Sequence, residues 1–512
     1  MAKFDTDGYF SSVTYPVEFH RQYTPVWLNL ATLICGHRPK PLDRPFRWCD
    51  IGCGQGFTAL SVAALYPHAE IYGFDFNPSH IENANRLASD AGVTNACFAD
   101  VSFETLANAT TGDWPKMDFI VMHGVWSWIS ATQRSHILRF IARHLAPGGV
   151  VYNGYNALAG WGALLPVQKL LRQFSASRPA VSGATIVAQA TALLRDLIKN
   201  NAVFFTDNPI ADRRLKFLGE QDVNYFCHEM LHEHWTPFSP DEVAADFASV
   251  QCGYIGSATL LENFDVFSVP QAMVPMLAST TDLAQKEILR DFGSARMFRR
   301  DLFRRGTEPP LPGDWLEGLD QITLTDLGLP DDGTMKIKTW GDEGLVLRAD
   351  IYGPVRQGLR SGALSLRDLR GIFPDTATLT ELIAVLTATG AAHPTPFIVA
   401  SETQQMRARA LNQVMSRINA AGGHVHMLAA PRLGTMLAVG AGEQALAMAF
   451  AAADTNNAVD EVALYFAASG RELLHAGQPV LEPEALLAGW RQVAGNFAAT
   501  RLKLLRTLGV PA

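Results

Sequence analysis

Short apolar segments alternate with amphipathic ones between residues 46 and 159. The apolar segments have the length and the aromatic and β-branched content of buried strands, and the others have helical spacing. The expected elements are, in chain order, Arg47–Ile51, Phe57–Leu65, Ile71–Phe76, Ser79–Ala91, Cys97–Val101, Phe119–His123, Gln133–Leu145 and Val150–Asn153. This alternation predicts an α/β fold with a parallel sheet and helices on both faces.

Two regions outside this alternation read as helical. Residues 1–45 are amphipathic and rich in aromatic side chains, and they predict a helical cap. Residues 160–235 begin with a long aliphatic stretch without strand pattern, and they predict a helical insertion. Sheet signals return in residues 236–308, which we assign with 46–159 to one core. There, Ser239-Pro-Asp-Glu predicts the start of a helix with an acidic first turn.

A proline-rich linker, residues 309–313, separates this core from an accessory domain at 314–512. Met335–Trp340 and Gly344–Ala349 predict a hairpin, and Leu364–Leu369 with Thr378–Ala388 predict a helical pair of winged-helix type. We therefore expect a C-terminal α+β, winged-helix-like domain. Because this region has little basic charge, we expect it to pack against protein and not to bind DNA.

The run Asp50-Ile-Gly52-Cys-Gly54-Gln-Gly56 joins the first strand to the first helix of the core. Glycines at alternate positions let the backbone turn sharply and approach a ligand closely. The second strand ends at Asp75, where a carboxylate can accept hydrogen bonds from ribose hydroxyls. An acid before the glycines disfavours a pyrophosphate and suits a ligand with an ammonium group. S-adenosylmethionine (SAM) has that group and is the predicted cofactor.

These residues resemble the cofactor motifs of class I SAM-dependent methyltransferases. The likeness rests on the Asp50–Gly56 run, on Asp75-Phe76 and on Asp100-Val101. It implies a Rossmann-like sheet in which Asp75 holds the ribose and Asp100 faces the adenine. It also implies that Tyr254–Leu260 and Met297–Arg304 are the sixth strand and the antiparallel seventh.

Two further strings, His123-Gly-Val-Trp126-Ser-Trp128 and Asn153-Gly-Tyr155-Asn156, narrow the resemblance. They are similar to bacterial methyltransferases that carry a methyltransferase regulatory domain, which include rickettsial outer-membrane-protein lysine methyltransferases. Trp126 departs from the tyrosine that the family has there. The resemblance implies SN2 methyl transfer to a protein lysine. The alternatives are a small-molecule or cell-surface glycan O/N-methyltransferase and a non-catalytic SAM-binding regulatory subunit.

The side chains after the fourth and fifth strands are the candidates for the acceptor side, because ligands bind at the carboxyl edge of such sheets. They are Trp126, Trp128, Tyr155 and Asn156. Aromatic rings there either orient an alkyl-ammonium chain or pack as a cofactor cap or core. His123 either contacts the methionine end of the cofactor or caps its strand. The base that removes the lysine proton stays unassigned among Tyr155, His123, Asp7 and the pair His228-Glu229.

The string His228-Glu-Met-Leu-His232 matches H-E-x-x-H, the zinc-protease motif. Pro237 ends the helix soon afterwards, and no suitable third ligand follows, so we predict no metal. The six cysteines of the 512-residue chain do not form a disulfide framework.

Composition limits the class of partner. A formal charge of −8 gives no reason to expect nucleic acid. The chain shows neither a signal peptide nor an apolar run long enough to span a membrane, so we expect a cytoplasmic protein. The helical insertion is the candidate contact for a homodimer.

Overall fold

The structure is a computed structural model of the chain. It describes residues 19–110, 112–178, 183–219, 229–306, 322–327, 336–337, 345–346, 348–362, 364–373, 375–396, 399–420, 425–453, 457–469, 472–475 and 478–510.

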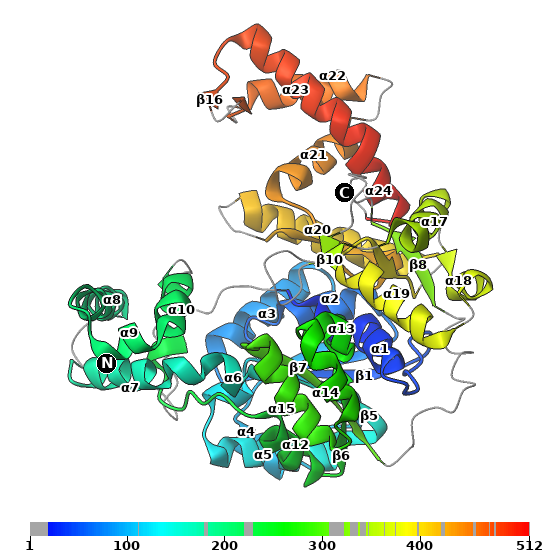
Figure 1. The fold of residues 1–512 in the computed structure, drawn as a ribbon. Coiled ribbons are helices and arrows are strands. Elements are labelled where there is room, and N and C mark those ends of the chain that lie inside the picture. Colours follow the sequence, from blue (N-terminus) through cyan, green and yellow to red (C-terminus); the bar gives the residue numbers. More distant parts are fainter. Residues whose placement is uncertain are drawn as a thin grey trace.

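A seven-stranded mixed sheet lies at the centre of the N-terminal part of the chain (Figure 1). Its strands are β1 (Arg47–Ile51), β2 (Glu70–Asp75), β3 (Ala96–Asp100), β4 (Met117–His123), β5 (Leu145–Asn156), β6 (Cys252–Ser257) and β7 (Phe298–Arg305). Their order is β3-β2-β1-β4-β5-β7-β6, with β1 to β5 parallel and β7 antiparallel between β5 and β6. The predicted Rossmann-like methyltransferase sheet, including its antiparallel strand, is confirmed. The strand order reverses between β1 and β4, where open α/β sheets bind ligands.

Helices cover both faces of the sheet, as the alternation predicts. The helices α1 (Pro25–Ile34), α2 (Phe57–Leu65) and α3 (Pro78–Asp90) pack on one face, and α4 (Phe103–Asn108), α5 (Ala131–His144), α12 (Pro240–Ala248) and α15 (Leu283–Ser294) lie on the other. Successive strand residues point to opposite faces, so Trp48 and Tyr152 belong to the first core and Cys49 and Tyr155 to the second.

Local signals in the sequence explain where two of these helices begin and end. The Ser239 backbone N–H donates a 2.8 Å hydrogen bond to the Glu242 carboxylate, which closes the first turn of α12. Helix α1 ends at Ile34, and Gly36 follows in the left-handed conformation with φ 77°. The described part of the predicted 1–45 cap is therefore helical only to residue 34, because Gly36 and three prolines before residue 46 prevent its continuation. Residues 1–18 of the predicted cap lie outside the described residues.

All regular elements in the described residues of the insertion after β5, up to residue 219, are helices. It contains α6 (Leu158–Trp161), α7 (Leu165–Ala176), α8 (Gly183–Lys199), α9 (Val203–Asp207) and α10 (Pro209–Gly219), grouped to one side of the sheet in Figure 1. These helices share an apolar core of their own that includes Trp161, Leu171 and Leu194. The Trp161 indole donates a 2.8 Å hydrogen bond to the Met297 carbonyl, which ties the insertion to the residue before β7.

After α12 and β6 the chain returns through α13 (Asp265–Ser268), α14 (Val274–Ser279) and α15 to β7. The proline-rich linker lies outside the described residues. Beyond it, β8 (Thr323–Asp326) pairs antiparallel with β11 (Leu364–Ser365) and β12 (Ala392–Pro394). Helices α17 (Ala349–Ser361), α18 (Leu366–Ile372) and α19 (Thr376–Ala388) complete the unit. The described elements follow in the order helix, short strand, two helices, strand. The strands β9 (Lys336–Ile337) and β10 (Leu345–Val346) pair antiparallel within the expected hairpin, and the winged-helix-like assignment stays a prediction.

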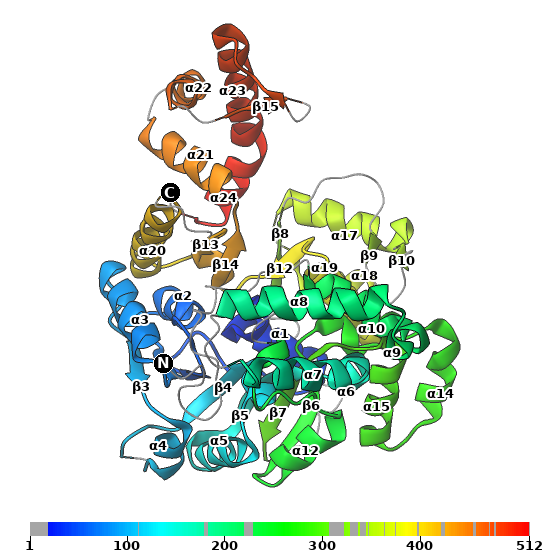
Figure 2. The ribbon, with the colours of Figure 1, turned by 90° about the vertical axis from the view of Figure 1, so that its left-hand side faces the viewer.

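The remainder of the chain contains α20 (Glu402–Ala420), β13 (Met427–Ala430), β14 (Thr435–Ala438), α21 (Ala441–Ala452), α22 (Ala458–Ala468), β15 (Leu474–His475), β16 (Gln478–Pro479), α23 (Pro483–Phe497) and α24 (Lys503–Thr507). Helices α21 to α24 share a separate apolar core and project away from the sheet (Figures 1 and 2). Helix α20 instead packs on α2, where the Gln404 amide donates to the Leu65 carbonyl at 2.9 Å. The accessory region thus contacts the helix that follows the glycine run.

Candidate functional site

The glycine run forms the tight turn between β1 and α2. All three glycines have positive φ, 77° at Gly52, 54° at Gly54 and 71° at Gly56. A Cβ at Gly52 would lie 2.5 Å from Val125 Cγ2, and one at Gly56 would lie 2.6 Å from Phe98 Cε1. A Cβ at Gly54 would have no heavy atom of the described residues within 4 Å. Gly52 and Gly56 are therefore required by packing as well as by conformation, whereas no described side chain packs against Gly54.

Asp75 lies beside this turn at the end of β2. Its carboxylate accepts hydrogen bonds from the backbone N–H groups of Gly54 and Asn77, both at 2.9 Å. His80 Nδ1 lies 3.4 Å from Asp75 Oδ1. Each carboxylate oxygen keeps a further lone pair, so the contacts fix the orientation of Asp75 and leave it able to accept from a ribose.

Asp50 is the penultimate residue of β1 and is 3% exposed. Burial, with a smaller contribution from the charge of Asp75, raises the pKa of Asp50 to about 8. A buried carboxylate is costly unless a cation compensates it. Among the described residues no lysine, arginine or histidine forms an ion pair with Asp50, and the ammonium group of SAM would supply that cation. The residues present therefore fit the predicted cofactor: Asp50 for its ammonium group and Asp75 for its ribose.

The remaining predicted cofactor residues are brought to the same edge. Asp100 ends β3 beside Asp75, its partner in the strand register, and is exposed. The Val101 backbone N–H donates a 3.0 Å hydrogen bond to the Asp75 carbonyl. Val101 and Phe76 are half-buried. Their role in holding the adenine stays a prediction.

Five ring side chains meet at the carboxyl ends of β4 and β5, and we call them the aromatic cluster: His20, Tyr23, His123, Tyr152 and Phe298. His123 Nδ1 and the Tyr152 hydroxyl are hydrogen-bonded at 2.7 Å. The ring centroid of His123 lies 4.1 Å from that of His20, 5.5 Å from that of Tyr23 and 5.0 Å from that of Phe298. The cluster joins the N-terminal segment, two parallel strands and β7.

Burial determines the charge state of this cluster. It lowers the pKa of His123 well below its usual range, and the neighbouring His20 and Arg300 lower it further. Burial likewise raises the pKa of Tyr152 above its usual range. Both side chains are therefore neutral near pH 7, and their hydrogen bond joins two uncharged groups.

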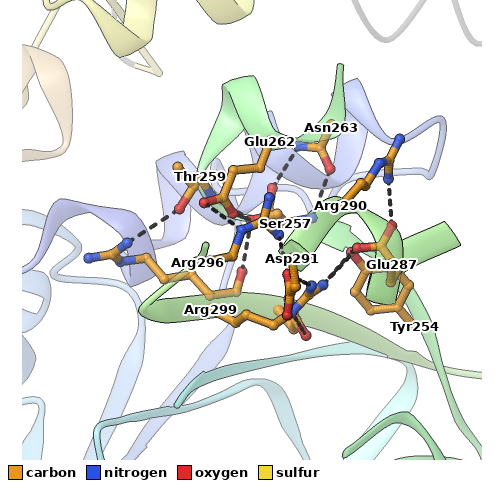
Figure 3. A network of polar contacts seen from close by, with 12 residues as sticks. Tyr254, Ser257, Thr259, Glu262, Asn263, Glu287, Arg290, Asp291, Arg296 and Arg299 are labelled. Atoms are coloured by element: carbon orange, nitrogen blue, oxygen red, sulfur yellow. Dashed lines mark hydrogen bonds and ion pairs between the residues drawn. The ribbon is translucent and has the colours of Figure 1, made fainter. Parts of the chain in front are cut away.

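Tyr155 does not belong to the aromatic cluster, although the sequence made it a catalytic candidate. It points to the opposite face of the sheet, is fully buried, and donates a 2.6 Å hydrogen bond to Asp301. Arg299 binds the same carboxylate and also contacts Glu287 and Asp291, in the polar network of Figure 3. The structure gives Tyr155 a packing role, because the alternation of β5 places Tyr152 and not Tyr155 on the cluster's face.

The two tryptophans after β4 also diverge. Residues Trp126–Trp128 form a single 3-10 turn, so the two side chains point in different directions. Trp126 is fully buried and its ring lies 5.2 Å from that of Phe247, within the sheet core. Trp128 is half-buried and lies 6.1 Å from the His232 ring, at the insertion. Trp126 is therefore core, and the predicted acceptor role is left to Trp128 alone.

Asn156 and Glu229 form a buried pair below the insertion. The Asn156 amide donates a 3.0 Å hydrogen bond to Glu229 Oε2, and the Trp235 indole donates to the same oxygen at 2.8 Å. Glu229 therefore fixes the end of β5 against the insertion, which favours packing over the zinc-protease alternative. His228, like Asp7, lies outside the described residues. In the described parts of the chain, no three His, Cys, Asp or Glu side chains group as metal ligands.

Sequence reasoning missed four members of the cluster, His20, Tyr23, Tyr152 and Phe298, and the neighbouring Arg300. The alternation of side chains along β5 separates Tyr152 from Tyr155, but it does not place Tyr152 beside His123. The other four residues come from segments that only the tertiary fold brings to β4.

Comparisons with known proteins identify the family of the chain. A sequence profile described as a methyltransferase domain matches residues 42–195. Another, described as a predicted methyltransferase regulatory domain, matches residues 222–305, which include β6, α15 and β7. Trans-aconitate 2-methyltransferase of Methylobacterium nodulans is 32% identical over 109 residues, 21% of this chain and 38% of that protein.

Two similarities extend over the whole chain. The uncharacterized protein sll1526 of Synechocystis sp. is 33% identical over 514 residues, covering 98% of this chain and 99% of that protein. The structure of PKMT2 from Rickettsia typhi in complex with AdoHcy matches with a TM-score of 0.70 at 20% identity, covering 97% of this chain and 99% of that one. The second similarity shows a shared fold, accessory region included.

Within the described residues, no helix combines the length and apolar character needed to cross a membrane.

One family assignment follows from the glycine turn, the two carboxylates beside it, the sheet order and the full-length relative. The chain belongs to the SAM-dependent class I methyltransferases that carry a methyltransferase regulatory domain.

Proposed function

We propose that this methyltransferase transfers the methyl group of SAM to the side-chain amine of a protein lysine. The aromatic cluster carries the proposal, since its rings border the edge of the sheet where the methyl group has to be presented. Rings at such a position contact the alkyl chain of lysine and exclude water from around the amine. The resemblance to rickettsial lysine methyltransferases supports the same acceptor.

Lysine attacks only as the neutral amine, so the acceptor has to lose a proton first. Bound SAM supplies an electrophilic methyl group on a sulfonium. His123 and Tyr152 are uncharged, so the surroundings of the amine have low polarity. Low polarity favours the neutral amine over the ammonium form. We infer that the cluster selects the nucleophilic form of the acceptor, with His123 as the residue that accepts a hydrogen bond from it.

The test uses purified enzyme, SAM with a labelled methyl group, and bacterial lysate divided into protein and small-molecule fractions. We expect label in protein, recovered as methyl-lysine after acid hydrolysis, and much less of it with Tyr152→Phe. If label enters only small molecules, the acceptor is a metabolite and not a protein lysine. SAM binding without label in any fraction would favour the regulatory-subunit alternative.

We also propose a homodimer formed through the insertion. Five large apolar side chains there are exposed, from 37% to 69%: Leu158, Leu165, Leu170, Val203 and Ile210. Apolar surface gathered in one unit favours burial against a second copy. Light scattering should give twice the chain mass, and Leu170→Glu should reduce it to that of a monomer.

A further inference from the structure

Arg300 lies at the edge of the aromatic cluster. It is the partner of Gly154 in the β5–β7 register, so it extends the row of residues that runs from His123 across β5. Its guanidinium carbon is 5.1 Å from the Phe298 ring centroid, and Nη1 donates a 3.4 Å hydrogen bond to the Thr259 hydroxyl. The positive charge of Arg300 lowers the pKa of the Tyr152 hydroxyl, against the larger effect of burial.

Arg299 on the other face of β7 and Arg296 on its approach are paired with carboxylates, and Arg305 donates to backbone carbonyls of α5 and β5. Arg299 contacts Glu287 at 2.7 Å and Asp291 at 2.6 Å, and Arg296 contacts Asp291 at 3.2 Å (Figure 3). Arg300 has no carboxylate within ion-pair distance in the described part of the chain. Its Nε is buried and has no hydrogen-bond acceptor there. A half-buried guanidinium without a carboxylate partner favours an anionic ligand.

Tyr152 lies on the strand between Arg300 and Asp50, the buried acid beside the glycine turn. Tyr152 shares a register row with Asp50, through Val121 of β4, and lies two positions before Gly154, the register partner of Arg300. A buried acid on β1 and a cation without a carboxylate partner on β7 thus lie on the same face of the sheet, with the strand of Tyr152 between them. An α-amino acid carries an ammonium and a carboxylate on the same carbon, and this pair of side chains is complementary to it.

We propose that Arg300 binds the α-carboxylate of the methionine part of SAM, while Asp50 takes the ammonium group. The planar guanidinium can bind a carboxylate through two hydrogen bonds, which an ammonium side chain cannot do. Residue 300 lies in the segment that matches the regulatory profile, so this segment contributes directly to the cofactor site. The proposal depends on SAM dependence alone and not on the identity of the acceptor.

Calorimetric titration with two ligands tests it: AdoHcy, and the decarboxylated analogue of AdoHcy that keeps the amine. Arg300→Ala should weaken AdoHcy binding about tenfold or more and the analogue less than about threefold. Arg300→Lys should recover part of the affinity for AdoHcy. The matched control is Arg491→Ala, which removes an exposed arginine on α23 that pairs with Asp460. Thermal unfolding shows whether each variant is folded.

Two outcomes overturn the proposal. Equal losses for both ligands would mean that Arg300 supports the site without contacting the carboxylate. Unchanged AdoHcy affinity in a folded variant would remove the cofactor role, and lower methyl incorporation into lysate protein by that variant would then assign Arg300 to the acceptor. Neither outcome would bear on methylation of lysine by the unmodified enzyme, so failure here and failure of the proposed acceptor are distinguishable.

Discussion

The phenol of Tyr155 donates a 2.6 Å hydrogen bond to the buried carboxylate of Asp301. This contact joins the last parallel strand, β5, to the antiparallel strand β7. Arg299 binds the same carboxylate at 2.8 Å, so Asp301 is held by a charged and a neutral partner at once. Arg300, between Arg299 and Asp301 in the sequence, lies on the opposite face of β7, beside the Phe298 ring of the aromatic cluster. The contacts of Asp301 on one face of β7 therefore hold the strand that carries Phe298 and Arg300.

Tyr155→Phe should lower the free energy of unfolding by about 1–3 kcal/mol, because it leaves a buried carboxylate short of one donor. AdoHcy affinity and turnover of the folded enzyme should stay within about threefold of the wild type. Urea unfolding and single-turnover methylation measure the two effects. The matched variant is Tyr152→Phe, which removes the hydroxyl bonded to His123 and should reduce turnover by about tenfold. The reverse pattern would return the catalytic role to Tyr155.

Asp75→Ala should weaken AdoHcy binding by about 2–4 kcal/mol, since the ribose loses charge-assisted hydrogen bonds and the Gly54 N–H loses its acceptor. Calorimetry gives the affinity directly. Asp90→Ala removes an exposed carboxylate at the end of α3 that pairs with Arg86, and it should leave affinity unchanged. Wild-type affinity in a folded Asp75→Ala protein would disprove the ribose assignment.

The raised pKa of Asp50 makes the ligand-free protein sensitive to pH. Its folded-state pKa of about 8 lies above the ordinary 3.8, so the folded state binds more protons between these values. The corresponding contribution to the free energy of unfolding is full below about pH 4 and is lost as pH rises through about 8. The free energy of unfolding in urea should therefore decline over this range more for the wild type than for Asp50→Asn.

Binding of AdoHcy should also depend on the ionisation of Asp50, but here the charged carboxylate is the favoured form. The ammonium group of AdoHcy favours the charged carboxylate, so binding at about pH 6.5 should release a proton from Asp50. Calorimetry in buffers of different ionisation enthalpy counts that proton, and Asp50→Asn should remove it. Absence of proton release in the wild type would mean that Asp50 does not face the ammonium group.

Trp126→Ala should lower the free energy of unfolding by about 3–5 kcal/mol, the usual cost of deleting a buried aromatic side chain. Trp128→Ala, at a half-buried ring, should cost less and should lower turnover if Trp128 lies beside the acceptor. Chemical unfolding and steady-state methylation measure both variants. A stable Trp126→Ala enzyme with about tenfold lower turnover would restore the acceptor role to Trp126.

Local chemistry along the chain determined much of the fold. Gly52, Gly54 and Gly56 require a turn that non-glycine residues adopt only with strain, and Asp75 ends a strand whose length the apolar pattern defines. Ser239-Pro-Asp-Glu specifies a helix start through bonds within four residues. These signals depend on interactions between residues close in sequence, so each segment can be predicted by itself. Together they identified the sheet, the cofactor and the family.

The tertiary structure alone decided which side chains share the site. Tyr152 and Tyr155 are three positions apart on one strand and point to opposite faces, and no local pattern indicates which face meets the cofactor. Trp126 became core because a 3-10 turn replaces the extended backbone that would have aligned it with Trp128. His20, His123 and Arg300 are brought together from segments more than a hundred residues apart. Contacts of that range depend on how whole helices and strands pack, which is why the sequence did not place these three side chains together.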